Sequence, residues 1–252
     1  MEFDLQDKAV LVTGSTRGIG RAIAEAFGLA GARVAINGRD KAGVAEAVGG
    51  RTRFFPVWGD VTIPESAQRI VDETLEAFGG LDVLVCNVGS GASVRPGEET
   101  PEEWQRVFAL NLWSVTNMVE AARPPLGATQ GSVVCVSSIC GSEVIPGAPV
   151  TYSAAKAALD AFVRGIARPL AEEGIRINAV APGNILFDDS TWSRKLKDDR
   201  AGVEDFLQSE VALGRFGTPN EVAELVLFLA SDRAGFSTGS VLRLDGGQAR
   251  SS

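Results

Sequence analysis

Short apolar runs alternate with longer amphipathic segments along most of the chain. The runs are KAVLVTG, ARVAING, RFFPVWGD, LDVLVCNVG, GSVVCVSS and IRINAVAPG, with GSVLRLDGG near the C-terminus. Segments with helical periodicity lie between them, among them residues 20–30, 64–78, 101–122 and 152–171. Because the runs are nearly all apolar and rich in Val and Ile, they are typical of strands covered on both faces. The pattern predicts an α/β fold, a doubly wound parallel sheet with helices on both faces.

No repeat, low-complexity linker or shift in composition divides the chain, so we expect one domain over residues 1–252. The longest interruption is residues 184–217, before a helix that begins near Pro219. This segment is too long for an ordinary connection. Its large apolar side chains, set among many charges, are Phe187, Trp192, Leu196, Phe206 and Leu207. We expect the segment to form a lid over a substrate.

Charge and cysteine content limit the class of partner. The net charge of -8 argues against nucleic acid and anionic membranes, which attract basic surfaces. The N-terminus lacks the pattern of a signal peptide, and no apolar run approaches membrane-spanning length. The 3 cysteines are odd in number and form no C-x-x-C, so neither disulfides nor a metal site is expected. These features predict a soluble cytoplasmic protein.

A glycine-rich turn stands between the first apolar run and the first helix. In VLVTGSTRGIGRAIAEAF, the glycines are Gly14, Gly18 and Gly20. Glycines let a backbone turn tightly and approach a pyrophosphate, and a helix N-terminus offers unpaired N–H groups to it. The spacing differs from the usual G-x-G-x-x-G, and a plain glycine-rich helix start is the alternative for the motif alone. Its position after a strand favours a Rossmann-like nucleotide site.

The sequence contains no histidine, so any proton transfer must use another side chain. The single tyrosine, Tyr152, precedes Lys156 by four residues in VTYSAAKAAL. On a helix both side chains project from one face, and an ammonium there favours the phenolate. We therefore expect Lys156 to lower the pKa of Tyr152 toward the range of a general acid or base. The pair alone is weak evidence, because most such pairs are a half-buried aromatic beside a solvated lysine.

Together the motifs resemble the short-chain dehydrogenase/reductase family over essentially the full length of the chain. They are T-G-x-x-x-G-x-G at 13–20, N-x-G at 87–89, Asn111, Ser138, Tyr152 with Lys156, and Pro182 with Gly183, in the family's order. The resemblance implies an oxidoreductase that transfers a hydride between NADP(H) or NAD(H) and a small-molecule carbonyl or secondary alcohol. It also implies a homotetramer or homodimer, paired through the helices at 101–122 and 152–171.

The resemblance further implies four catalytic residues. Tyr152 would exchange a proton with the substrate oxygen, and Lys156 would stabilise the phenolate and hold the nicotinamide ribose. Ser138 would orient the substrate oxygen, and we prefer it to Ser137 because the family's serine precedes x-x-Gly. Asn111 would hold a water that links the lysine to solvent.

The cofactor contacts implied by the resemblance are Gly14, Arg17, Gly18, Ile19, Gly20, Arg39, Asp60, Val61, Asn87, Gly89, Tyr152, Lys156, Pro182 and Gly183. NAD-dependent enzymes usually end the second strand with an acidic residue, but this chain has Gly38 there, followed by Arg39. Arg39 and Arg17 could bind a 2′-phosphate, although Asp40 could pair with Arg39. We predict that NADP(H) is preferred and that NAD(H) is possible.

Two other functions stay open at this point. One is reduction of 3-oxoacyl groups on acyl carrier protein, which is acidic and needs basic residues nearby. It ranks second because GATQGS at 127–132 and AEEGIR at 171–176 are neutral or acidic where those reductases are often basic. The other is a non-catalytic nucleotide-binding regulator, which usually has a broken tetrad.

The sequence does not specify the substrate or the direction of the reaction. Loops after the fourth, fifth and sixth runs predict a moderately apolar pocket lined by Val94, Arg95, Val144, Ile145, Phe187 and Trp192. The family commonly has Thr where this chain has Phe187, so the contact to the nicotinamide amide is expected to differ.

Overall fold

One parallel sheet forms the centre of the computed structural model, which describes residues 3–250. Its strands are β1 (Ala9–Val12), β2 (Arg33–Gly38), β3 (Phe54–Trp58), β4 (Val83–Cys86), β5 (Ser132–Val136), β6 (Arg176–Pro182) and β7 (Val241–Leu244). Their order is β3-β2-β1-β4-β5-β6-β7, and every neighbouring pair is parallel. The predicted fold class is confirmed. The expected domain, 1–252, includes residues 1–2 and 251–252, which lie outside the described range.

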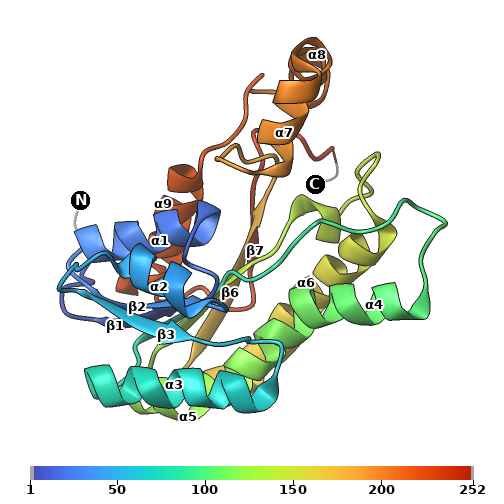
Figure 1. Ribbon diagram of the computed structural model, residues 1–252. Coiled ribbons are helices and arrows are strands. Elements are labelled where there is room, and N and C mark those ends of the chain that lie inside the picture. Colours follow the sequence, from blue (N-terminus) through green and yellow to red (C-terminus); the bar gives the residue numbers. More distant parts are fainter. Residues whose placement is uncertain (1–2, 251–252) are drawn as a thin grey trace.

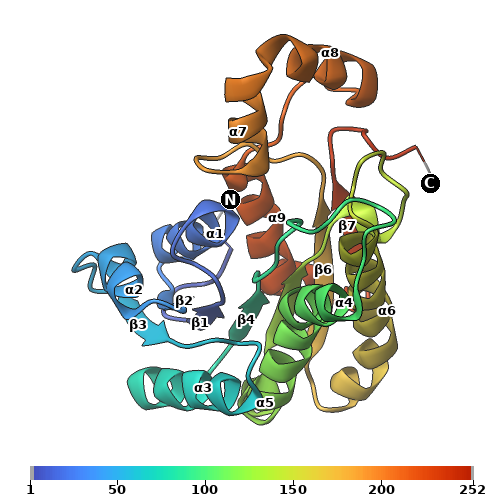
Figure 2. The same cartoon turned by 45° about the vertical axis from the view of Figure 1, so that its right-hand side comes forward.

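Helices cover both faces of this sheet, as Figure 1 and Figure 2 show. They are α1 (Gly18–Leu29), α2 (Lys41–Val48), α3 (Pro64–Phe78), α4 (Pro101–Phe108), α5 (Ser114–Thr129), α6 (Val150–Glu172), α7 (Thr191–Asp198), α8 (Arg200–Glu210) and α9 (Pro219–Ala230). One core cluster joins the sheet to α1, α2 and α9, and the other joins it to α3, α5 and α6. Among residues 3–250, no helix has both the length and the apolar character needed to cross a bilayer.

Local sequence explains where several elements begin and end. Pro56 lies in β3, an edge strand, where a missing backbone N–H leaves no ladder bond unmade. Pro64 and Pro219 occupy the first turns of α3 and α9, where proline fits the helix without losing a hydrogen bond. Gly79 ends α3 with a φ of 77°, a left-handed conformation that glycine adopts without steric cost.

The helix expected over residues 101–122 is divided in the structure. A π-helical turn, Ala109–Trp113, separates α4 from α5, and α5 continues to Thr129. Asn111 lies in this turn, and its Nδ2 donates to the carbonyl oxygen of Val107 at 3.0 Å. A side chain that bonds to the preceding turn competes with the backbone ladder, and single π turns often mark functional sites.

Residues 184–217 contain two helices, α7 and α8, which stand beyond the carboxyl ends of the strands (Figure 1). They share a small core in which the ring of Trp192 stacks on Phe206 at 5.1 Å and contacts Phe216 at 5.2 Å. The two ends of the segment meet, because Gly217 N donates to Asn184 O at 2.9 Å and Leu186 N donates to Gly217 O at 3.0 Å. Residues 184–217 therefore form a compact substructure whose two ends lie side by side, and we call these joined ends its base.

Candidate active site

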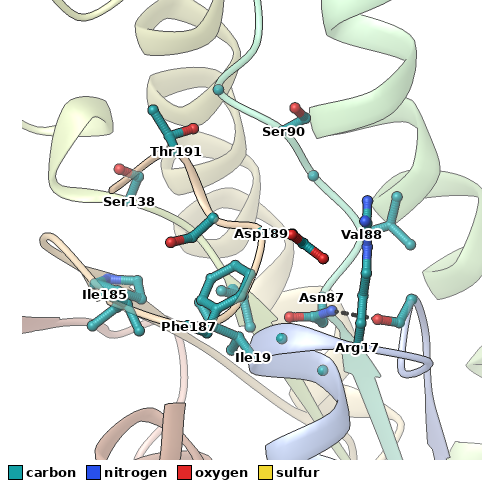
Figure 3. Close-up of a pocket in the computed structure, with 18 of the residues that line it drawn as sticks. Arg17, Ile19, Asn87, Val88, Ser90, Ser138, Ile185, Phe187, Asp189 and Thr191 are labelled. Carbon is teal, nitrogen blue, oxygen red and sulfur yellow. Dashed lines mark hydrogen bonds between the residues drawn. The ribbon is translucent and has the colours of Figure 1, made fainter. Parts of the chain in front are cut away.

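A cavity of about 550 Å³ opens at the carboxyl edge of the sheet, where the strand order reverses between β1 and β4. Every cofactor contact expected from the sequence lines it, and these residues are Gly14, Arg17, Gly18, Ile19, Gly20, Arg39, Asp60, Val61, Asn87, Gly89, Tyr152, Lys156, Pro182 and Gly183. Ser138 lines it as well, whereas Asn111 lies behind the wall. Figure 3 shows the ring of Phe187 above the first turn of α1.

The glycine turn forms the floor of one end of this cavity. Gly14 and Gly18 have φ values of 61° and 57°, which side chains rarely tolerate. A Cβ atom on Gly20 would stand 2.4 Å from Gly14 O, so helix and turn pack too closely for any side chain. The N-cap of α1 is Arg17, whose side chain does not cap the helix. The N–H groups of the first turn therefore remain available, and this arrangement fits the phosphates of a dinucleotide.

Two asparagines hold the glycine turn in place. Asn87 Nδ2 donates to the carbonyl oxygens of Thr13 and Gly14, both at 3.1 Å. Asn37, buried at the end of β2, accepts a hydrogen bond from Gly14 N at 3.3 Å and donates to Val57 O at 3.2 Å. The sequence motifs predicted Asn87 beside the cofactor but gave no role to Asn37. An amide near the end of an otherwise apolar run, VAING, was the available signal.

Two exposed arginines line the cavity, Arg39 directly after β2 and Arg17 at the N-cap of α1. Within residues 3–250, neither forms an ion pair. The carboxylate of Asp40 accepts a hydrogen bond from Gly43 N at 2.7 Å and caps α2. Asp40 therefore serves the helix and does not neutralise Arg39. Both guanidinium groups are available to an anionic ligand.

Asp60 follows β3 and borders the same part of the cavity. Its Oδ1 accepts hydrogen bonds from Thr62 N at 2.9 Å and from Thr62 Oγ1 at 2.7 Å. The alternative role, capping of α3, is excluded because the N-cap residue is Ile63 and no side chain caps that helix.

Ser138 and Tyr152 both line the other end of the cavity. Ser138 Oγ also accepts a hydrogen bond from Cys140 N at 3.2 Å at the start of a 3₁₀ turn. The neighbouring Ser137 donates its hydroxyl to Asp160 on α6. Of the two serines, Ser138 is thus the one that acts on Tyr152, because its side chain lowers the pKa of the phenol.

Lys156 lies one turn after Tyr152 on α6 and is almost completely buried, at 3% exposure. Its Nζ donates to the carbonyl oxygen of Val136, the last residue of β5, at 2.8 Å, and lies 5.9 Å from the centre of the Tyr152 ring. Burial lowers the pKa of Lys156 to about 8. The ammonium is therefore easier to deprotonate than that of an exposed lysine.

The expected effect of Lys156 on Tyr152 is not found. Burial raises the pKa of Tyr152 to about 12, and the hydrogen bond with Ser138 only partly opposes this. The reason is geometric, because the ammonium is directed to Val136 and not to the phenolic oxygen. The tyrosine is consequently held in its protonated form, as a proton donor requires.

Asn111 supports the wall behind Lys156. Its Oδ1 accepts from Ser90 N at 3.0 Å, and its Nδ2 donates to Ser90 O at 3.1 Å. A Cβ atom on Gly89 would stand 2.9 Å from Asn111 Oδ1 and 3.2 Å from Lys156 Nζ. Only glycine lets the loop after β4 fit between these two side chains, so Asn111 holds that loop against the lysine.

The substrate side of the cavity differs from the expectation. Phe187 and Trp192 line it as predicted, but Val94, Arg95, Val144 and Ile145 do not, and Val144 is 92% exposed. These loops extend past the cavity instead of folding into it. Polar residues take their place, namely Asn184, Asp189, Ser190, Thr191 and Arg194. The wall offered to a substrate is more polar than predicted.

Comparison with known proteins agrees with this geometry. A family model described as enoyl-(acyl carrier protein) reductase matches residues 14–249. The chain is 36% identical to 3-oxoacyl-[acyl-carrier-protein] reductase of Chlamydia muridarum, over 97% of this chain and 98% of that one. It is 38% identical to L-rhamnose 1-dehydrogenase (NAD(P)(+)) of a Sphingomonas strain, over 96% of each chain. L-sorbose reductase of Gluconobacter frateurii, solved with NADPH and L-sorbose, superposes with a TM-score of 0.93 at 30% identity over 100% of both chains.

Proposed function

The chain belongs to the short-chain dehydrogenase/reductase family, and we propose that it is an NADP(H)-preferring enzyme that interconverts a polar small-molecule carbonyl compound and its alcohol. One observation carries the proposal. A single cavity has an uncapped helix N-terminus behind a glycine turn at one end, and Ser138 with Tyr152 above Lys156 at the other. A dinucleotide fits between them, with its phosphates at the turn.

The proposed mechanism uses the hydride that a bound nicotinamide supplies or accepts. Ser138 orients the substrate oxygen by a hydrogen bond, next to the Tyr152 hydroxyl. In reduction Tyr152 donates its proton to that oxygen. In oxidation its phenolate accepts the proton of the substrate alcohol. Lys156 would hold the nicotinamide ribose, and its positive charge, 5.9 Å from the centre of the Tyr152 ring, would oppose negative charge on the phenolic oxygen, while Asn111 keeps the adjacent loop in position. Because the pKa of Tyr152 is about 12, the hydroxyl carries its proton at neutral pH.

Preference for the phosphorylated cofactor is supported by Gly38 and Arg39 at the end of β2 and by Arg17 in the glycine turn. Gly38 offers no carboxylate to a ribose hydroxyl, and Arg17 and Arg39 make no ion pair within the described residues. L-sorbose reductase, which shares this fold, was solved with NADPH. NAD(H) use remains part of the proposal as the weaker alternative.

A second candidate function is reduction of 3-oxoacyl groups on acyl carrier protein. The description of the family model and the chlamydial relative favour it. The neutral and acidic segments at 127–132 and 171–176 precede β5 and β6, at the sheet edge opposite the cavity. Within one chain they therefore do not argue against a carrier protein at the cavity mouth. Comparing kcat/KM for free ketones and ketoses with that for a 3-oxoacyl carrier protein separates the two functions.

The assembly and the location are also proposals. We infer one domain, 1–252, with a lid at 184–217. We also infer that the chain forms a homotetramer or homodimer paired through α4, α5 and α6. Trp113, in the π-helical turn between α4 and α5, and Val150, at the start of α6, are each 44% exposed, which supports contacts with a second copy. Cys86, Cys135 and Cys140 are free thiols, in keeping with a reducing cytoplasm. Light scattering at micromolar concentration tests the assembly, and a monomer would contradict it.

The central test of the function is Tyr152→Phe, which removes one hydroxyl and keeps the ring. Because only the transferable proton is lost, kcat should fall about a thousandfold while cofactor affinity stays near that of the wild type. Lys156→Ala should damage both, since the lysine is proposed to act on the ribose and on the tyrosine. Steady-state rates and cofactor titrations separate the two effects. Near-normal turnover by Tyr152→Phe would reject the mechanism.

A further inference from the structure

Asp160 is a buried acidic residue directly behind the proposed catalytic residues. It lies on α6 with 1% exposure, and its Oδ1 accepts the hydrogen bond from Ser137 Oγ at 2.5 Å. Its Oδ2 has no hydrogen-bond partner in the described part of the chain. A Cβ atom on Gly141 would stand 2.9 Å from this Oδ2, so the oxygen is enclosed by backbone. A buried carboxylate with one neutral donor is unfavourable for the fold.

The position of Asp160 relates it to Lys156. The two residues are four apart on α6 and both are buried, so they share the face that packs on the sheet. Lys156 donates to a neutral carbonyl oxygen and forms no salt bridge within residues 3–250. Asp160 is therefore placed to supply a negative charge to a buried ammonium whose direct hydrogen-bond partner is uncharged.

The titration of both groups agrees with this arrangement. Burial lowers the pKa of Lys156 to about 8, and Cys135 on β5, then Asp160, then Cys140 in the 3₁₀ turn oppose the effect. Burial raises the pKa of Asp160, against the hydrogen bond from Ser137 and the charges of Arg164 and Lys156. Asp160 is the one carboxylate among the groups that act on Lys156.

We propose that Asp160 is a positioning residue of the reaction, which keeps Lys156 in its ammonium form and, by binding Ser137, leaves Ser138 as the serine that meets Tyr152. The inference rests on the proposed function, because the ammonium of Lys156 has a role only if Tyr152 and a nicotinamide ribose act beside it. The competing explanation is a structural aspartate that merely joins α6 to the end of β5. The two explanations predict different results when the charge alone is removed.

Asp160→Asn is the informative substitution, because it keeps the size of the side chain and an oxygen for Ser137. Without the carboxylate, Lys156 loses its proton at a lower pH. The alkaline limb of kcat/KM for carbonyl reduction, normalised to its own maximum, should therefore move down by about 1 pH unit. Thermal unfolding of the variant shows whether it still folds.

Glu172→Gln is the matched control. Glu172 lies on the same helix but is exposed, so its loss changes the net charge equally while solvent screens the effect, and the limb should stay in place. Asp160→Ala provides a second variant, in which the limb should move in the same direction. Three results would establish the structural explanation instead. The alkaline limb stays in place in both Asp160 variants, it moves equally in Glu172→Gln, or neither Asp160 variant folds. Tyr152→Phe, assayed in parallel, shows separately whether the proposed function itself fails.

Discussion

The ring of Phe187 lies directly on Gly18, so that a Cβ atom added to Gly18 would stand 2.7 Å from Cε2 of the ring. The contact joins two walls of the cavity, because Phe187 belongs to the loop after β6 and Gly18 begins α1 after the glycine turn. It also explains why a large aromatic side chain occupies position 187, because the ring packs on the core cluster that includes residues of α1 and α9. The loop and the glycine turn are thus positioned together.

This contact predicts the effect of Gly18→Ala. The new methyl group meets the Phe187 ring, and the φ of 57° is itself unfavourable for alanine, so the turn must shift. The dissociation constant of NADPH, measured by fluorescence titration, should rise about tenfold or more, since the phosphate site depends on backbone position. Adding Phe187→Ala should restore only that part of the lost NADPH affinity which is due to the clash between the new methyl group and the ring.

Gly80→Ala is the control for that experiment. A Cβ atom at Gly80 would find its nearest neighbour at 3.8 Å, an ordinary contact, and Gly80 does not line the cavity. Cofactor binding should be unaffected. Full recovery by the double substitution would show that φ at Gly18 has no part in the effect.

Arg39 should determine the choice between the two nicotinamide cofactors. Arg39→Ala is expected to lower kcat/KM with NADPH about tenfold or more, because a charge-assisted hydrogen bond to the 2′-phosphate is lost, and to leave the value with NADH nearly unchanged. Arg21→Ala is a suitable control, since Arg21 is engaged with Glu25 on α1. A wild-type preference for NADH, or an NADPH preference untouched by Arg39→Ala, would show that Arg39 does not bind the phosphate.

Much of the fold can be predicted from local sequence. Strands such as VLVTG and GSVVCVSS are buried on both faces, so their apolar character identifies them without knowledge of their neighbours. Pro64 and the glycine after Phe78 mark both ends of α3, and the predicted and observed ranges coincide. The motif order likewise identified the cofactor-side residues that the structure brings into one cavity.

What the sequence did not reveal depends on packing between distant segments. The pKa of Tyr152 is set by burial and by the direction of the Lys156 ammonium, neither of which is determined by their spacing on α6. The polar wall near Thr191 arises because residues 184–194 border the cavity, while the loop that carries Val144 does not line it. The tasks of Asn37 and Asp160 depend on residues 23 positions away in each case, Gly14 and Ser137.

The pH dependence of the two directions should differ. Burial raises the pKa of Tyr152 to about 12, so the hydroxyl stays protonated and available for reduction throughout the neutral range. Burial lowers the pKa of Lys156 to about 8, so reduction should proceed evenly below that pH and decline above it as the ammonium is lost. Oxidation needs the phenolate and should accelerate as pH rises toward the tyrosine pKa until loss of the ammonium limits it. Profiles of kcat/KM in both directions test this, and a reduction rate that climbs above pH 8 would contradict it.

The segment 184–217 should close as a unit over the bound ligands. Trp192, Phe206 and Phe216 give α7 and α8 a core of their own, and the base of the segment is narrow, joined by the hydrogen bonds between residues 184–186 and Gly217. Such a body can tilt without losing its internal packing. Hydrogen exchange in 184–190 should slow when NADPH and a substrate bind, while exchange within α8 changes little.

Trp192→Ala tests the same motion from the other side. The indole joins the lid core to its base, because Nε1 donates to Asn184 Oδ1 at 3.1 Å, and Asn184 borders the cavity. Without it the lid should remain attached but close less firmly, which raises KM for the carbonyl substrate several-fold and leaves NADPH affinity near that of the wild type. Leu213→Ala, a change at a 65% exposed position outside the lid core, should alter neither value. If exchange in 184–190 is equally slow with and without ligands, or if Trp192→Ala leaves KM unchanged, the segment is a fixed wall and not a lid.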